Sequence, residues 1–264
     1  TSLQQLIDEH PNDLLGKSVV DRFGKDFRIL IKFIDAKQDL SIQLHPNDEL
    51  AKKRHNSFGK TEMWYIMAAD PKAQLIVGFN KEVSKEEYVQ SLDNNTLLDL
   101  LNYETVQEGD TFFINTGKMH AIGAGVLLAE IQQTSDITYR VFDFNRRDKN
   151  GNLRELHTEL ALDAIDYRKK DDFKVAYSKE IDKVNAMVNC PYFKTNFLQL
   201  SKNQTLDTKK RESFTIYMCV GGSVVVANEH GEALIVKGET VLVPAMSKNI
   251  TLRTEGAKLL EVTI

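Results

Sequence analysis

Two side chains able to bind a metal ion stand two positions apart in the apolar stretch 40–46: the amide of Gln43 and the imidazole of His45. If this stretch forms a β-strand, side chains at i and i+2 point to the same face of the sheet. The strand would then present an amide oxygen and an imidazole side by side from a rigid element. The competing interpretation is a strand that ends on a solvent-facing histidine before a turn. Residues elsewhere in the chain are needed to distinguish a metal site from this alternative.

A carboxylate and a second imidazole are the further candidates. Glu62 shares one face of the predicted strand 59–67 with Trp64 and Ile66, where a carboxylate needs a cation or hydrogen-bond donors. His120 follows a Gly-Asp turn and an apolar strand. The candidate metal ligands are therefore Gln43, His45, Glu62 and His120. Two imidazoles, one carboxylate and one amide oxygen suit a borderline divalent ion such as Zn²⁺, and we expect one ion per chain.

The composition is that of an ordinary globular protein. The chain has 264 residues and a net charge of −4, from 38 acidic and 34 basic residues. It has no basic stripe interleaved with aromatic residues, which argues against a nucleic-acid partner. No apolar run approaches the roughly 18 residues that a membrane span requires. We therefore expect a cytoplasmic protein without a membrane partner.

The remaining histidines and the cysteines show no metal-ligand spacing. We expect the histidines outside the candidate site to lie on the surface: His10, His55, His157 and His230. Cys190 and Cys219 are too few for a disulfide framework and lack the spacing of a redox motif.

Short β-strands are expected to position the candidate side chains. Apolar or alternating stretches predict strands over 27–34, 40–46, 59–67, 109–114, 126–132 and 138–146. Lys32 lies in the middle of the first of these strands. Its ammonium must either reach solvent or meet an anion inside the fold, because an unpaired buried charge is costly.

Helices are fewer, and they bear on the domain organisation. They are predicted over 1–16, from a cap at Asn47 or Asp48, from a capping box at Ser84 to about Leu101, and over 157–165.

The polar segment 166–172 is typical of a domain boundary. From residue 192 onward, short strands alternate with glycine-containing turns, which predicts a β-sandwich or a small barrel. We therefore predict a mainly β protein with two domains, 1–168 and 169–264, and a helical insertion at about 84–102.

Two stretches of the chain share a spacing that indicates an internal repeat. Gly109 and Gly238 each open a Gly-acid turn followed by an apolar strand. His120 and Asn249 each lie eleven positions past their glycine. The chain thus contains two related β-units, one with an imidazole at the key position and one without it.

The segment from Gly109 to His120 closely resembles the second conserved motif of the cupin β-barrel superfamily, with Asn115 where a proline is usual. The wider series resembles type I mannose-6-phosphate isomerases in Ser41-Ile42-Gln43-Leu44-His45-Pro46, Gly59-Lys60-Thr61-Glu62, Gly117-Lys118-Met119-His120-Ala121 and Thr138-Tyr139-Arg140-Val141. A weaker likeness to the shorter bacterial members covers the rest. Family members normally carry a further N-terminal segment, so we expect this chain to begin late relative to them.

The resemblance implies two cupin-like β-barrel (jelly-roll) domains. The first, 1–168, would be catalytic and metal-binding, whereas the C-terminal domain, 169–264, would lack metal ligands because Asn249 replaces the histidine. The resemblance also implies a zinc-dependent aldose-ketose isomerase that interconverts D-mannose 6-phosphate and D-fructose 6-phosphate through an enediol(ate). Its partner would be a small-molecule sugar phosphate.

Family likeness assigns the catalytic position to Arg140. Its guanidinium stays protonated near neutral pH, so we expect it to stabilise charge and orient the substrate rather than to act as a base. The substrate contacts that the likeness implies are Ser41, Lys32 and Lys60. The carrier of the proton between C1 and C2 stays open among a metal-bound hydroxide, Glu130 and Asp136.

Two other kinds of function stay open at the level of sequence. One is a metal-dependent cupin enzyme of another reaction type, such as an oxygenase, although oxygenases favour iron with more imidazoles. The other is a non-catalytic sugar-binding or regulatory cupin, against which the retention of Arg140 and the ligand set argues. Gln43 is the weakest ligand candidate, because a neutral amide is a poor zinc ligand, and binding to substrate is its alternative role.

Overall fold

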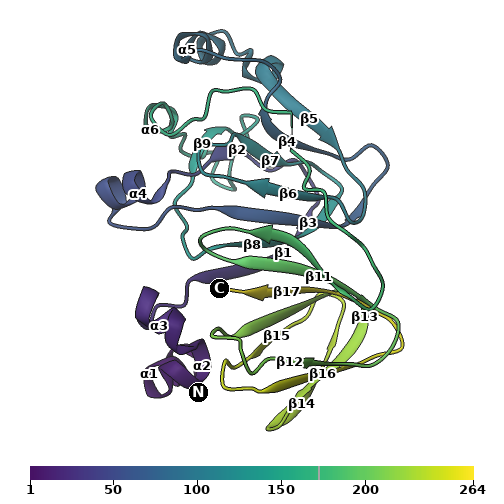
Figure 1. Cartoon of the computed structure of the whole chain (residues 1–264). Helices are drawn as coiled ribbons and strands as arrows, with labels where there is room; N and C mark the ends of the chain where they lie inside the picture. The colour runs from purple at the N-terminus through teal and green to yellow at the C-terminus, as the bar shows by residue number, and fades with distance from the viewer. Residues whose placement is uncertain (172) are drawn as a thin grey trace. The chain divides into compact units, whose positions relative to one another are not determined.

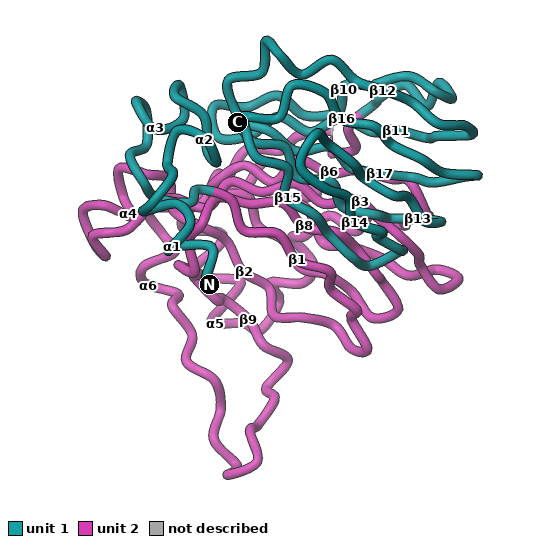
Figure 2. Tube along the Cα trace, turned by 90° about the horizontal axis from the view of Figure 1, so that it is seen from below, with its two compact units in different colours: residues 1–28, 176–264 teal, residues 29–175 magenta. Residues whose placement is uncertain are grey.

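A computed structural model of the chain describes residues 1–171 and 173–264. The chain folds into two compact units, which Figure 2 colours separately. The central unit comprises residues 29–175, and the terminal unit comprises residues 1–28 and 176–264. Both units are built mainly from β-strands, as predicted (Figure 1). Among the described residues, no helix has the length and apolar character needed to cross a bilayer.

The central unit contains two antiparallel sheets. One has the strand order β1 (Ile29–Ala36), β8 (Val126–Gln133), β3 (Glu62–Ala69), β6 (Thr111–Ile114). The other has the order β5 (Leu101–Thr105), β4 (Gln74–Phe79), β7 (His120–Ile122), β2 (Ile42–Leu44), β9 (Tyr139–Phe142). These strands confirm the elements predicted around the candidate ligands, with ends shifted by a few residues.

Alternating side chains give the five-stranded sheet two apolar faces. Leu75 and Val77 on β4 pack with Trp64 of β3 in a core between the two sheets. Ile76, which lies between them in sequence, packs on the opposite face with Tyr88. The side chains that point between the sheets are therefore surrounded by protein on both sides.

Short helices cover the outer face of the five-stranded sheet. They are α5 (Lys85–Asp93), η1 (Leu97–Leu100) and α6 (Thr158–Ala161), and α4 (Asp48–His55) follows β2 along the chain. The predicted caps are present, since the side chains of Asn47 and Ser84 accept hydrogen bonds from the backbone N–H groups of Leu50 and Glu87. Helix α6 is shorter than the predicted helix 157–165.

The terminal unit combines three N-terminal helices with an eight-stranded sheet. The helices are α1 (Leu3–Glu9), α2 (Pro11–Leu15) and α3 (Lys17–Phe23). The strand order is β10 (Val184–Asn189), β11 (Lys194–Leu200), β17 (Ala257–Thr263), β13 (Thr215–Asn228), β16 (Asn249–Arg253), β12 (Gln204–Asp207). The strands β14 (Gly231–Val236) and β15 (Thr240–Val243) also pair with β13.

The N-terminal segment differs from the single helix predicted over 1–16. Pro11 begins a second helix, and a third follows Gly16. Gly16 has a φ of +97°, and a Cβ atom there would lie 2.1 Å from the carbonyl oxygen of Glu212. The backbone N–H of Phe214 also donates to the carbonyl of Leu15 at 3.1 Å. These contacts place residues 1–28 with the C-terminal strands, whereas the predicted division at residue 168 assigned them to the first domain.

The two repeated segments have the same local backbone order. Gly109 and Gly238 have positive φ angles of 84° and 92°, and each precedes a four-residue strand, β6 or β15. The next strand begins at His120 in the first repeat and at Asn249 in the second. The spacing found in the sequence therefore corresponds to a shared turn-strand-turn arrangement.

Candidate active site

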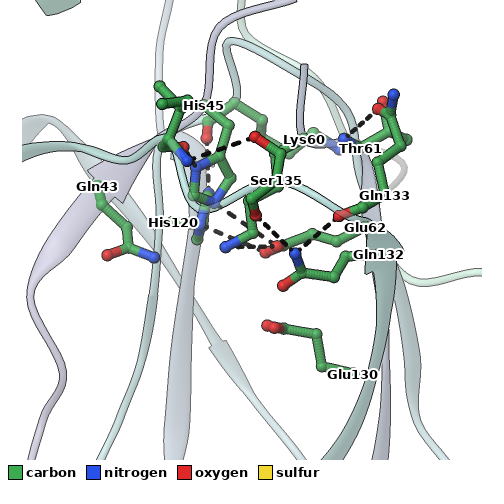
Figure 3. Close-up of polar contacts among 12 residues, drawn as sticks. Gln43, His45, Lys60, Thr61, Glu62, His120, Glu130, Gln132, Gln133 and Ser135 are labelled. Atoms are coloured by element: carbon green, nitrogen blue, oxygen red, sulfur yellow. Dashed lines mark hydrogen bonds and ion pairs between the residues drawn. The ribbon is translucent and has the colours of Figure 1, made fainter. Parts of the chain in front are cut away.

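Strand alternation directs the candidate ligands into the space between the two sheets. Ile42 and Leu44 are fully buried in the core beneath the helices, so Gln43, between them, points the other way. On the facing sheet, Glu62 shares the side of β3 on which Trp64 packs between the sheets. Both sheets thus contribute polar side chains to one interior region, which Figure 3 shows.

His45, Glu62 and His120 form a compact group in this region (Figure 3). Their ligand atoms lie within 4.8 Å of one another. Nε2 of His45 and Nε2 of His120 each lie 3.5 Å from a different carboxylate oxygen of Glu62. None of these four buried atoms has a hydrogen-bond partner among the described residues. Buried polar atoms are normally satisfied, so their convergence fits a bound cation.

Backbone carbonyls orient both imidazoles toward the centre of the group. Nδ1 of His45 donates to the carbonyl of Ile137 at 2.9 Å, and Nδ1 of His120 donates to the carbonyl of Lys118 at 2.8 Å. With the proton held on Nδ1, each Nε2 presents its lone pair. This arrangement is typical of histidines that bind metal ions.

Burial sets the protonation states of the group. It lowers the pKa of His120 to about 3 and lowers the pKa of His45 well below its usual value, with the charge of Lys60 acting in the same direction. Burial, reinforced by the charge of Glu130, raises the pKa of Glu62 to about 8. The imidazoles are therefore ready to bind a metal at neutral pH, and a divalent cation would favour the ionised carboxylate.

Gln43 lies beside this group (Figure 3). Its backbone pairs with His120 on β7 and with Arg140 on β9. Its Oε1 accepts a hydrogen bond from Oγ of Ser41 at 3.4 Å. Whether Gln43 completes a metal site or contacts substrate stays a prediction.

A pocket of about 210 Å³ opens next to the metal-ligand group. Its lining includes Lys32, Ser41, Gln43, Lys60, Trp64, His120, Glu130, Arg140 and Arg154. All three expected substrate contacts therefore lie around one cavity together with the expected catalytic arginine. Four of these side chains are cationic and one is a carboxylate, so the pocket favours an anionic ligand.

Lys32 meets an anion, which settles how its charge is accommodated in an apolar strand. Its Nζ lies 2.6 Å from Oε1 of Glu130 and 2.5 Å from Oε1 of Gln132. The other carboxylate oxygen of Glu130 accepts a hydrogen bond from Nε1 of Trp64 at 3.0 Å. Glu130 is thus held in place at the pocket wall, whereas Asp136 is exposed and is absent from the lining.

Two hydrogen bonds hold the guanidinium group of Arg140 in place. Its Nε donates to Oγ of Ser41 at 3.3 Å, and its Nη1 donates to the carbonyl of Glu155 at 3.1 Å. Burial lowers the pKa of Arg140, and the charge of Arg154 acts in the same direction. An arginine nevertheless remains protonated at neutral pH.

His157 is not the surface residue that the sequence suggested. It is partly buried, and its Nδ1 accepts the backbone N–H of Arg140 at 3.2 Å. The backbone N–H of His157 donates to the backbone carbonyl of Arg140 at 2.7 Å.

Arg154 was not among the predicted site residues, because in the sequence it resembles an ordinary cation in a polar turn.

Comparisons with known proteins identify the family to which the chain is similar. Residues 1–78 match the family model "Phosphomannose isomerase type I, catalytic domain", and residues 183–262 match "Mannose-6-phosphate isomerase, cupin domain". The chain is 34% identical over 239 residues to mannose-6-phosphate isomerase ManA of Bacillus subtilis, covering 89% of this chain and 74% of that protein. It is 33% identical over 248 residues to mannose-6-phosphate isomerase of Streptococcus mutans, covering 94% and 76%.

Solved structures show the same fold. The crystal structure of the mannose 6-phosphate isomerase from Bacillus subtilis superimposes with a TM-score of 0.88 at 31% identity, covering 99% of this chain and 82% of that chain. A mutant of phosphomannose isomerase from Salmonella typhimurium gives a TM-score of 0.81 at 16% identity, covering 100% and 85%, which shows a likeness of fold. The identities and coverage of the bacterial relatives show that this chain belongs to the family of type I mannose-6-phosphate isomerases.

Proposed function

We propose that the chain is a zinc-dependent isomerase that interconverts D-mannose 6-phosphate and D-fructose 6-phosphate through an enediol(ate). The observation that carries this proposal is the convergence of four buried ligand atoms of His45, Glu62 and His120, none with a hydrogen-bond partner among the described residues, beside a cation-lined pocket. The printed names of the bacterial relatives support the choice of substrate.

The metal would be held by His45, Glu62 and His120, with Gln43 as the candidate fourth ligand. Imidazole and carboxylate ligands suit zinc, and one ion per chain is expected. When bound, zinc supplies Lewis-acid polarisation of the substrate oxygens. The backbone contacts of both histidines would keep the ligands oriented before the metal arrives.

Arg140 would stabilise the negative charge that develops on oxygen as the proton moves between C1 and C2. Its guanidinium is held at the pocket by Ser41 and Glu155, so little reorganisation accompanies the reaction. Glu130 is the better supported proton carrier of the two carboxylates considered, because it lines the pocket whereas Asp136 does not. Its carboxylate would accept the proton from one carbon and return it to the other.

Lys32, Lys60 and Ser41 would bind the phosphate group or the sugar hydroxyls. Lys60 is only 5% exposed and lies 3.5 Å from Glu62, so it links the pocket with the metal-ligand group. Lys32 is more exposed and faces Glu130. Cationic donors of this kind form the stronger, charge-assisted hydrogen bonds to phosphate oxygens.

We propose further that the two repeated segments mark two cupin-like jelly-roll domains. The first, catalytic domain, predicted as 1–168, would have its folded core in the central unit and contain the helical insertion at about 84–102, in which α5 and η1 lie; its residues 1–28 group with the C-terminal strands. The second, 169–264, would lack metal ligands because Asn249 stands in place of a histidine. Cytoplasmic location, without a nucleic-acid or membrane partner, stays a prediction from composition.

A coupled assay tests the proposed function. Mannose 6-phosphate is supplied to the purified protein, and fructose 6-phosphate is followed before chelation, after chelation and after zinc is restored. We expect turnover that chelation abolishes and zinc restores. Absence of turnover with bound sugar phosphate would instead support a non-catalytic sugar-binding protein, and turnover that resists stringent chelation would contradict the metal requirement.

A further inference from the structure

The segment between β9 and α6 forms a hairpin that ends at the pocket. Figure 2 shows this segment projecting from the rest of the central unit. Arg147 and Leu153 form an antiparallel bridge across it. At its tip, Oδ1 of Asp148 accepts the backbone N–H groups of Asn150 and Asn152 at 2.8 and 2.9 Å. The hairpin therefore has a defined turn, and its returning strand leads directly to Arg154.

A single buried carboxylate holds the base of this hairpin. Asp143 is 5% exposed, and its Oδ2 accepts a hydrogen bond from Nε of Arg154 at 2.6 Å. Its Oδ1 accepts from Nη2 of Arg154 and from Nε of Arg146 at 3.1 Å. Burial alone would raise the pKa of Asp143, but the two guanidinium groups lower it below its usual value. One negative charge thus anchors two positive charges.

The arginine side of the pocket consequently has an excess of positive charge. Lys32 has Glu130 as a partner, and Lys60 has Glu62. Among the described residues, the hydrogen bonds of the Arg140 guanidinium go to a hydroxyl and a backbone carbonyl rather than to a carboxylate. Two guanidinium groups near one cavity repel each other unless an anion lies between them.

We infer that Arg154 is a second guanidinium of the phosphate subsite and that Asp143 positions it. The inference rests on the proposed function and extends it. The hydrogen bonds to Asp143 use Nε and Nη2 of Arg154, so its Nη1 would donate the charge-assisted hydrogen bond to a phosphate oxygen. Both pocket arginines are tied to the hairpin: Arg154 belongs to it, and the carbonyl of Glu155 holds Arg140. Arg154 would therefore help the site to select phosphorylated over neutral hexoses.

Substitution of Arg154 tests the role of its charge. For R154Q we expect KM for mannose 6-phosphate to rise about 10- to 100-fold with little change in kcat, since charged hydrogen bonds contribute at this scale. Competitive inhibition by inorganic phosphate should weaken in parallel. K149Q removes an exposed lysine from the same hairpin outside the pocket lining and should leave both quantities unchanged.

Binding of inorganic phosphate, measured by calorimetry, keeps this test separate from the assay of the proposed function. If the unmutated protein does not isomerise mannose 6-phosphate, the proposed function fails, while phosphate affinity still reports on Arg154. If a folded R154Q variant keeps the unmutated KM and phosphate affinity, the inference is overturned and the proposed function stands.

Asp143 requires a test that separates positioning from stability. D143N should raise KM for mannose 6-phosphate in the Arg154 background and have no further effect on KM in the R154Q background, because residues acting through one another are not additive. R154K should recover part of the phosphate affinity lost in R154Q. Equal effects of D143N in both backgrounds would show that Asp143 acts independently of Arg154 and would overturn its positioning role.

Discussion

Lys32 and Glu130 are register partners across β1 and β8, and the Lys32 ammonium lies 2.6 Å from the Glu130 carboxylate. Trp64, the partner of Glu130 on β3, donates to the other carboxylate oxygen. A row of three residues across neighbouring strands therefore fixes one carboxylate at the pocket wall. The charge in the middle of an apolar strand is explained by the anion opposite it.

Substitutions of Glu130 and Lys32, the two charged residues of this row, should have different effects on the steady-state kinetics. E130Q should lower kcat about 10²- to 10⁴-fold with a smaller change in KM, because it removes the proposed proton carrier. K32M should raise KM, because it removes a cation from the substrate pocket, and should lower kcat less than E130Q does, because it removes one of the two contacts that fix Glu130. Steady-state kinetics of both variants would check this, with the exposed E159Q on α6 as a control. A near-normal kcat in E130Q would rule out Glu130 as the carrier.

The metal-ligand group predicts a defined stoichiometry. Elemental analysis should find about one zinc per chain in the unmutated protein and almost none in H120A, because metal affinity depends on the complete ligand set. H230A, which removes an exposed histidine of the terminal unit, should keep its zinc. Two zinc ions per chain, or unchanged zinc in H120A, would contradict the proposed site.

The raised pKa of Glu62 predicts a pH-dependent metal affinity. In the metal-free protein this carboxyl group holds its proton up to about pH 8, so zinc binding must release it. Apparent affinity should therefore rise about tenfold per pH unit below 8 and level off above it. Calorimetry in buffers of different ionisation enthalpy would count the released protons. An affinity that is independent of pH between 6 and 8 would argue against this.

The same groups shape the stability of the metal-free protein. Folded Glu62 retains a proton that the unfolded chain loses above about pH 4.5, so the free energy of unfolding should fall as pH rises toward 8. Folded His120 stays neutral down to about pH 3, so stability should also fall as pH drops below 6.5. Urea unfolding at several pH values would measure both changes in the free energy of unfolding. E62Q should abolish the decrease between about pH 4.5 and 8.

Arg140 should not tolerate replacement by lysine. R140K keeps the charge but loses the fork that contacts both Ser41 and the carbonyl of Glu155. We expect kcat to fall about 10²- to 10³-fold, the range found when a preorganised donor is removed. Zinc content and melting temperature serve as controls and should stay near those of the unmutated protein. Full activity in R140K would refute the catalytic assignment.

Gly117 connects the two histidine segments, and its substitution should affect the whole site. Its N–H donates to the carbonyl of His45 at 2.8 Å, its φ is +79°, and an added Cβ would lie 2.5 Å from the carbonyl oxygen of Ala164. G117A should lower the free energy of unfolding by a few kcal/mol, about 2 or more.

Gly151 provides a matched control for this prediction. Its φ of +82° is similar, but nothing lies within 4 Å of an added Cβ. G151A should therefore lower the free energy of unfolding by only about 1–2 kcal/mol, the cost of a left-handed backbone conformation for alanine. Equal losses in the two variants, measured by chemical denaturation, would show that the contact with Ala164 is unimportant.

The ligand group could be predicted from the sequence because each member belongs to a local motif. Alternation along a strand decides which way Gln43 or Glu62 points, and that information lies within a few residues of each. Arg154 was not predictable in this way, because its place at the pocket depends on the return of a hairpin and on a carboxylate eleven positions earlier. The grouping of residues 1–28 with the C-terminal strands likewise depends on contacts between distant parts of the chain, such as Gly16 with Glu212.

The strand β2 has only three residues, yet it joins the candidate metal ligand His120 on one side to Arg140 on the other. A slip of one residue would turn Ile42 and Leu44 toward the pocket and Gln43 toward the helices. Each apolar side chain removed from the core would forfeit about 1.5–3 kcal/mol, so the slipped form is also poorly folded. Molecules with a slipped β2 would therefore be largely unfolded as well as inactive, and unfolded chains are the form that quality-control proteases remove.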